Sequence, residues 1–170
     1  MALVPGVFQQ IPTISNGAIY GAGDCIGGIQ KLSIAGQGRN QARLQSVVVQ
    51  DQSNQKAPLT LLFFSADPTA ITVNPATVAD NMPFAWGTGG ATGTFLGKVD
   101  VAAGDYETIG GQAIATKAGL LLPMQVAAPG GGVSGGPVPS LYIAVVTTGT
   151  PTYGSVSALT FELGFDALSW

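Results

Sequence analysis

The sequence predicts an all-β fold, a single-domain antiparallel β-sandwich of about eight strands in a jelly-roll-like arrangement. Short segments rich in β-branched and aromatic residues recur along the chain, and each is bounded by Gly, Pro, Asn or Asp. No long window repeats its apolar residues at the helical period of about 3.6 residues. The length of 170 residues fits one domain, because domains commonly contain about 100–200 residues.

The clearest strand signal lies near the end of the sequence. Leu159, Phe161, Leu163 and Phe165 alternate with polar residues or Gly, a pattern typical of a half-buried strand. The segment Leu59–Phe64 is apolar on both faces, which predicts a central strand covered on both sides. The full set of expected strands is 30–35, 42–50, 59–64, 95–101, 108–117, 140–147 and 157–165, with 19–26 as a candidate eighth.

Residues 1–17 are expected to form an N-terminal arm, and residues 18–170 the β-sandwich domain. The arm contains Pro5 and Pro12 and shows neither a helical nor a strand period, so we expect an irregular lead-in. Two Gly-rich stretches, 87–94 and 129–139, are interpreted as long surface loops. Neither stretch separates two halves of domain size, so the sequence predicts no domain boundary within the sandwich.

The composition points to assembly into a larger structure. Charged residues make up 9% of the chain, against about 25% in ordinary soluble domains, and the net charge is −3. A surface with so few charges favours association, so we expect a homodimer, or as second choice a homotrimer. The six Lys and Arg residues are scattered, which argues against direct nucleic-acid binding. The low-polarity stretch Ala118–Val126 is broken by Pro123 and is too short to span a bilayer, so no membrane partner is expected.

The residue types needed for most catalytic and metal sites are scarce. The chain has no His and only one Cys, which excludes His-dependent nucleophile systems, internal disulfides and structural zinc sites of the usual kind. Cys25 is interpreted as a small buried core residue. Asp100, Asp105 and Glu107 are the only carboxylates close together in sequence, and we interpret them as solvated turn residues. The sequence therefore predicts no enzyme, no cofactor and no metal, with a glycosidase, a lyase or a calcium site as weaker alternatives.

Four aromatic residues are candidate interface anchors: Phe8, Phe84, Trp86 and Trp170. Aromatic residues outside strands often bind partners, because they bury a large area at little cost in conformational entropy. The alternative is that they fill the ends of the sandwich.

Six segments carry a resemblance to a known group of proteins. They are Tyr20–Gly28, Phe63–Thr69, Asp80–Ala85, Leu141–Val146, Thr150–Tyr153 and Leu159–Phe165. Together they resemble the capsid cement or decoration proteins of tailed bacteriophages. The resemblance covers roughly residues 18–166 and departs from the group at the Gly-rich insert 129–139 and at the Trp170 ending.

The resemblance implies a jelly-roll-like structural protein on the outside of the virion, assembled in the host cytoplasm. Such a protein binds the major capsid protein, clamps neighbouring capsid subunits and commonly forms a symmetric oligomer. No catalytic residues come with the resemblance. The alternative function is a phage-associated carbohydrate- or receptor-binding β-sandwich, for which Trp86 with Asp80 or Glu107 would form the cleft.

Overall fold

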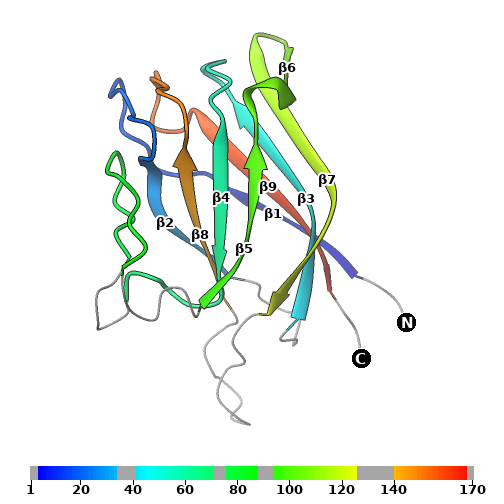
Figure 1. Cartoon of the computed structure of the whole chain (residues 1–170). Helices are drawn as coiled ribbons and strands as arrows, with labels where there is room; N and C mark the ends of the chain where they lie inside the picture. Colours follow the sequence, from blue (N-terminus) through cyan, green and yellow to red (C-terminus); the bar gives the residue numbers. More distant parts are fainter. Residues whose placement is uncertain (1–3, 34–40, 71–75, 88–93, 126–139, 168–170) are drawn as a thin grey trace.

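The computed structural model describes residues 4–33, 41–70, 76–87, 94–125 and 140–167. These residues form nine β-strands and no α-helix (Figure 1). The strands are β1 (Val4–Gln10), β2 (Cys25–Ser33), β3 (Gln41–Asp51), β4 (Leu59–Phe64), β5 (Phe95–Val101), β6 (Tyr106–Ile109), β7 (Gln112–Gln125), β8 (Ser140–Thr147) and β9 (Leu159–Ala167). A 3₁₀ turn, η2 (Ala103–Asp105), precedes β6.

The strands form two antiparallel sheets that pack face to face. One sheet has five strands in the order β1-β9-β3-β7-β6, and the other has four in the order β2-β8-β4-β5. In Figure 1 the four-stranded sheet lies in front of β1, β9 and β3. With the short strand β6 set aside, the orders 1-9-3-7 and 2-8-4-5 are those of a jelly roll, in which most connections cross from one sheet to the other. The predicted fold class is therefore confirmed.

The main core lies between the sheets and follows the predicted alternation. Leu159, Phe161, Leu163 and Phe165 of β9 are all buried in it. They face apolar residues of β4 and β8, whose side chains point into the core from the other sheet. These are Leu59, Leu61, Phe63, Leu141, Ile143 and Val145. Burial of this apolar surface is the dominant stabilising contribution to the fold.

Strand β4 is covered on both faces, as its sequence predicts. Leu61 and Phe63 point into the main core, whereas Leu62 and Phe64 belong to a second apolar cluster on the outer side of the sheet. A sheet with apolar residues on its outer face needs a further layer to cover it. That layer comes from residues 76–87.

The expectation of an irregular N-terminal lead-in is wrong for residues 4–10. They form β1, which pairs with β9 along its whole length, from Val4 opposite Ala167 to Gln10 opposite Phe161. The sequence pattern does not predict this strand, because Pro5 and Gly6 are residue types that are disfavoured inside sheets. Pro is tolerated here because β1 is an edge strand.

Other strands also differ from the sequence-based prediction. The expected strand 108–117 is split into β6 and β7 by a tight turn at Gly110 and Gly111, which have φ values of 61° and 86°. The expected strands 19–26 and 30–35 are replaced by the single strand β2, with a register shift between Cys25 and Ile29. Most of the predicted loop 87–94 and all of the predicted loop 129–139 lie outside the described residues. No helix in the described part of the chain is long and apolar enough to cross a bilayer.

Candidate interaction surface

Residues 76–87 cover part of the outer face of the four-stranded sheet. Ala76 and Val78 from this segment are buried with Leu62, Phe64 and Ala144 of the sheet. The segment doubles back on itself, since Thr77 and Ala85 exchange backbone hydrogen bonds of 2.8 and 3.2 Å. It therefore forms a small second layer with an apolar underside.

The segment is tied to the start of β2 by backbone hydrogen bonds. The Cys25 N–H donates to the Met82 carbonyl at 2.8 Å, and the Phe84 N–H donates to the Gly23 carbonyl at 2.9 Å. The Asn81 N–H donates in turn to the Cys25 carbonyl at 2.8 Å. These bonds fix the position of Phe84 and, two residues later, of Trp86.

Asp80 anchors the same segment through its side chain. Its Oδ1 accepts hydrogen bonds from the Tyr20 hydroxyl at 2.8 Å and from the Gly27 N–H at 2.6 Å. Its Oδ2 accepts from the Ser15 N–H at 2.9 Å and the Ser15 hydroxyl at 2.5 Å. Both carboxylate oxygens are thus occupied by donors from the protein itself, which is how a partly buried charge is normally stabilised.

Four aromatic rings meet where this layer reaches the sheet, and we call them the Trp86 cluster: Phe64, Phe84, Trp86 and Phe95. The Trp86 ring contacts Phe84 with centroids 5.0 Å apart and Phe95 with centroids 5.1 Å apart, both edge to face. Phe64 lies beneath them, fully buried, 5.9 Å from Trp86 and 5.8 Å from Phe95. Edge-to-face pairs of this kind contribute about 0.5–1.5 kcal/mol each beyond the area that they bury.

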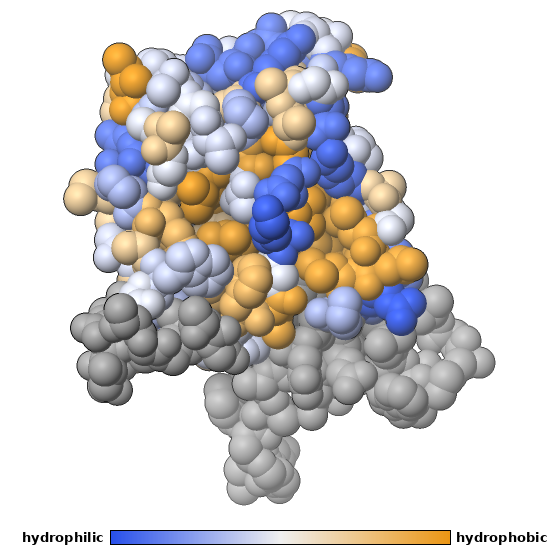
Figure 2. Space-filling view, viewed as in Figure 1, coloured by the Kyte–Doolittle hydropathy of each residue, from blue (hydrophilic) through white to orange (hydrophobic). Residues whose placement is uncertain are grey.

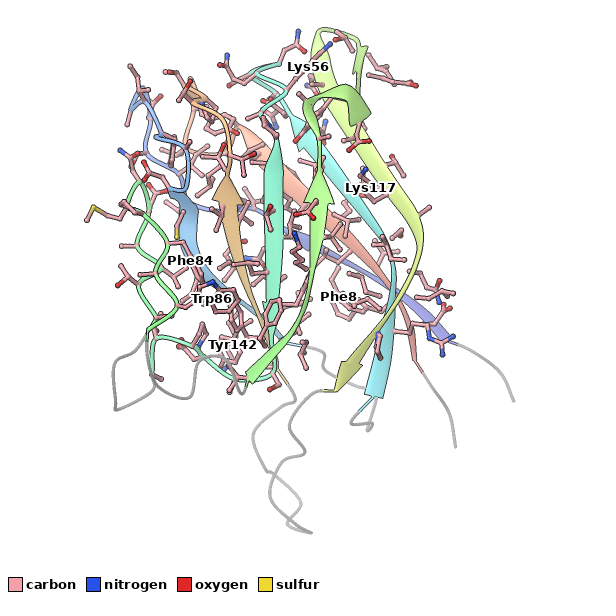
Figure 3. All side chains as sticks on the ribbon, viewed as in Figure 1. Phe8, Lys56, Phe84, Trp86, Lys117 and Tyr142 are labelled. Carbon is pink, nitrogen blue, oxygen red and sulfur yellow. The ribbon has the colours of Figure 1, made fainter. Side chains whose placement is uncertain are left out.

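The cluster is open to solvent at Trp86, which is 38% exposed. Figure 3 shows Phe84, Trp86 and Tyr142 gathered on the same side of the molecule. Lys31 lies over the Tyr142 ring, 5.9 Å from its centroid. The surface beside the cluster is low in charge, because Asp80 is the only charged residue in segment 76–87.

Figure 2 shows hydrophobic residues spread across the face that contains this surface, with a strongly hydrophilic break over β5. Strand β5 exposes Lys98 and Asp100, which form an ion pair of 2.7 Å with each other. Because each charge already has a partner of opposite sign, the break adds little net charge to the face. The face as a whole is suited to neutral contacts.

The three predicted interface residues that the structure describes do not all converge. Phe84 and Trp86 lie together in the Trp86 cluster, whereas Phe8 packs edge to face on Phe165 with centroids 5.7 Å apart. Phe8 is partly buried against the main core, a position that matches the alternative in which an aromatic residue fills the sandwich. Trp170 lies outside the described residues. The sequence did not reveal the partners Phe64 and Phe95, because they come from strands that meet only in the folded chain.

Two of the three carboxylates considered as catalytic candidates form ion pairs with lysines. Asp100 contacts Lys98 and accepts a 2.8 Å hydrogen bond from the Thr60 hydroxyl, and the Lys98 contact lowers the pKa of Asp100 below its usual value. Asp105 contacts Lys117 at 2.5 Å, and this contact lowers the pKa of Asp105. A general acid at neutral pH needs the opposite shift. Glu107 is exposed on β6, in the five-stranded sheet, whereas Asp100 lies on β5, in the four-stranded sheet.

Asp51 is the one described carboxylate with a raised pKa, and burial is the main cause. Its oxygens accept backbone hydrogen bonds from Ser53, Gln55 and Lys56 at 2.9, 2.7 and 2.9 Å. These bonds close the turn after β3, so the buried carboxylate organises a loop. Sequence reasoning missed both Asp51 and Asp80 as structural carboxylates, since nothing in the local sequence shows which backbone groups they will meet.

Within the described residues, no three His, Cys, Asp or Glu side chains lie close enough together to hold a metal ion. Cys25 is fully buried, and burial raises the pKa of its thiol to about 12. The chain matches no protein-family model, and no curated protein is significantly similar to it.

Proposed function

We propose that this chain is a structural virion protein that binds the outer surface of a bacteriophage capsid and clamps neighbouring major capsid subunits. The observation that carries the proposal is the Trp86 cluster, a partly exposed aromatic surface on a face where the exposed charges Lys98 and Asp100 are paired with each other. Buried aromatic anchors dominate the energetics of protein interfaces. A shell repeats one binding surface many times, so an anchor of this kind can act at many equivalent sites.

The scarcity of charge supports the same proposal. With 9% charged residues, the chain relies little on ion pairs that salt would screen. A protein that binds only the assembled shell stabilises it by mass action, by RT ln(1 + [L]/Kd) per site. At a hundred-fold excess over Kd this is about 2.7 kcal/mol per site, which multiplies over the many sites of a shell. The shell is thereby held together without any chemical step.

The test uses shells assembled from a bacteriophage major capsid protein, taken from a reading frame beside this chain's gene if one there encodes such a protein. Binding is measured by co-sedimentation for the natural chain, for Trp86→Ala and for the control Trp86→Phe. We expect Trp86→Ala to weaken binding about ten-fold or more, and Trp86→Phe to weaken it less because an aromatic ring is kept. Binding should persist in about 1 M NaCl, since few charges are available to be screened. Equal binding by Trp86→Ala and the natural chain, or complete loss of binding in salt, would overturn the proposal.

A carbohydrate-binding function has less support from the geometry. An exposed Trp can stack on a sugar, but recognition also needs carboxylates free to accept hydrogen bonds from hydroxyls. Both oxygens of Asp80 are occupied, and Glu107 lies on β6 of the other sheet. Glycan-array binding that depends on Trp86 would favour this alternative over the capsid function.

A further inference from the structure

Strand β1 forms one outer edge of the five-stranded sheet. It pairs with β9 on one side, and no backbone hydrogen bond joins its other side to any residue in the described part of the chain. An edge strand presents a row of free backbone N–H and C=O groups, which is a template for pairing with another strand. The sequence of β1, VPGVFQQ, carries no charge.

The other edges of the two sheets carry features that discourage pairing. Strand β2 has an exposed Lys31 and a register shift next to Gly27 and Gly28. Strand β5 exposes Lys98 and Asp100 and has a register shift of its own. Charges and bulges of this kind are the usual protection of edges against other chains.

The edge beyond β6 is protected in the same way. Strand β6 has four residues and contains Glu107. Where β7 extends past the end of β6 it forms the edge itself, and there it contains Lys117 and Pro123. The register of β7 also shifts opposite Leu44 and Ser46. Among the described edges, β1 is therefore the long, uncharged one.

Pro5 determines which residues of β1 face the free edge. In a sheet, Pro is tolerated where its nitrogen points away from the neighbouring strand, because it has no N–H to donate. Backbone groups alternate in direction along a strand, so Val7 and Gln9 turn their N–H and C=O groups to the same side as Pro5. The side chain of Val7 is 72% exposed.

We propose that β1 pairs antiparallel with β1 of a second copy of this chain, about a two-fold axis at Val7. Val7 is the middle residue of the strand, so the pairing sets Val7 opposite Val7 and Pro5 opposite Gln9. The two Val7 residues exchange both of their backbone hydrogen bonds, and each Gln9 N–H donates to the Pro5 carbonyl of the other copy. Because Pro5 has no N–H, one backbone hydrogen bond is absent at each end of the interface.

This arrangement makes one continuous sheet across the two copies. The interface is isologous, as most homodimer interfaces are, and no charge on β1 opposes it. The contact area is small, so the dimer is expected to be weak and to form at about 10–100 µM. It does not depend on capsid binding, and the isolated chain can test it.

The first test is sedimentation of the natural chain, Val7→Lys and Ile19→Lys. Ile19 is a matched control, because it is 71% exposed and lies outside β1. Two lysines opposite each other at the two-fold axis repel, so Val7→Lys should weaken the dimer about ten-fold or more. Ile19→Lys should leave the dimer unchanged. A natural chain that stays monomeric at about 100 µM, or equal dissociation by both variants, would overturn the proposal.

The second test fixes the register. Opposed residues of a hydrogen-bonded antiparallel pair have Cα atoms about 5.5 Å apart, within the range that a disulfide spans. Val7→Cys should therefore form a disulfide-linked dimer under mild oxidation, and Ile19→Cys should not. Cys25 does not interfere because it is buried. Failure of Val7→Cys to cross-link, or equal cross-linking by Ile19→Cys, would exclude the pairing about Val7, whatever the capsid experiment shows.

Discussion

Tyr20 and Tyr153 contact each other edge to face in the core, with ring centroids 5.8 Å apart, yet within the described residues only the Tyr20 hydroxyl of the two has a hydrogen-bond partner. Both rings are fully buried. The Tyr20 hydroxyl donates to Asp80 and accepts from the Ser15 N–H at 2.9 Å. The Tyr153 hydroxyl has no partner among the described residues. Two neighbouring tyrosines thus contribute to stability in different ways.

Removal of each hydroxyl should separate these contributions. Tyr20→Phe leaves the Asp80 carboxylate without one of its donors, so we expect the free energy of unfolding to fall by about 1–3 kcal/mol. Tyr153→Phe removes a buried polar group that has no partner, so stability should stay within about 0.5 kcal/mol or rise. Urea denaturation measures both values. Equal destabilisation by the two variants would contradict a stabilising contribution of the hydrogen bond between Tyr20 and Asp80.

Gly27 should not tolerate any side chain. Its φ is 73°, and a Cβ at this position would overlap the Pro12 Cβ. We expect Gly27→Ala to lower the free energy of unfolding by about 3 kcal/mol or more. Gly110 is the control, because its φ is 61° and nothing lies within 4 Å of a Cβ there. Gly110→Ala should cost only the backbone penalty of about 1–2 kcal/mol, and a similar loss in both variants would contradict the close approach of Pro12.

The Cys25 thiol should be inert in the folded chain. Burial, with smaller contributions from Asp24 and Asp80, raises its pKa to about 12, so very little thiolate is present near neutral pH. We expect no labelling by iodoacetamide at about pH 8 without denaturant, and full labelling in urea. Ile19→Cys, with its exposed thiol, provides the positive control. Rapid labelling of Cys25 in the folded chain would contradict its burial.

The ion pair between Lys117 and Asp105 should stabilise the fold only where Asp105 is ionised. Its folded-state pKa is lowered by Lys117, so the contribution is present above the unfolded pKa of about 3.9 and is lost as the pH falls through the folded value. Lys117→Met should therefore lower the melting temperature slightly at pH 7. The difference from the natural chain should shrink toward about pH 2, and a difference that does not change with pH would exclude this ion pair as its cause.

The predictable part of the fold is the part with a strong local pattern. The alternation in Leu159–Phe165 and the two-sided apolar run Leu59–Phe64 predict β9 and β4 correctly. Strand β1 has no such pattern, because Pro5 and Gly6 interrupt it and its stability comes from pairing with β9. The Gly110–Gly111 turn was missed because the residues on both sides are rich in strand formers.

The candidate site was predictable only in part. Trp86 and Phe84 are predictable as interface anchors because they lie outside the expected strands, beside Pro83 and Gly87. Their packing on Phe64 and Phe95 depends on contacts between segments far apart in the sequence, which no local pattern encodes. The same holds for Asp80, whose donors Ser15 and Tyr20 lie 65 and 60 residues away in sequence.

The pairing of β1 with β9 has a consequence for how the chain folds. Strand β9 lies between β1 and β3, so the five-stranded sheet lacks an inner strand until residues 159–167 have been synthesised. Until β9 emerges, β1 has no strand to pair with and β3 can pair only with β7, so apolar residues of both strands stay partly exposed during synthesis. Contacts of such long sequence separation also make folding slow. The chain should therefore fold mainly after β9 has emerged, and it should depend on chaperones more than a protein whose neighbouring strands follow one another in sequence.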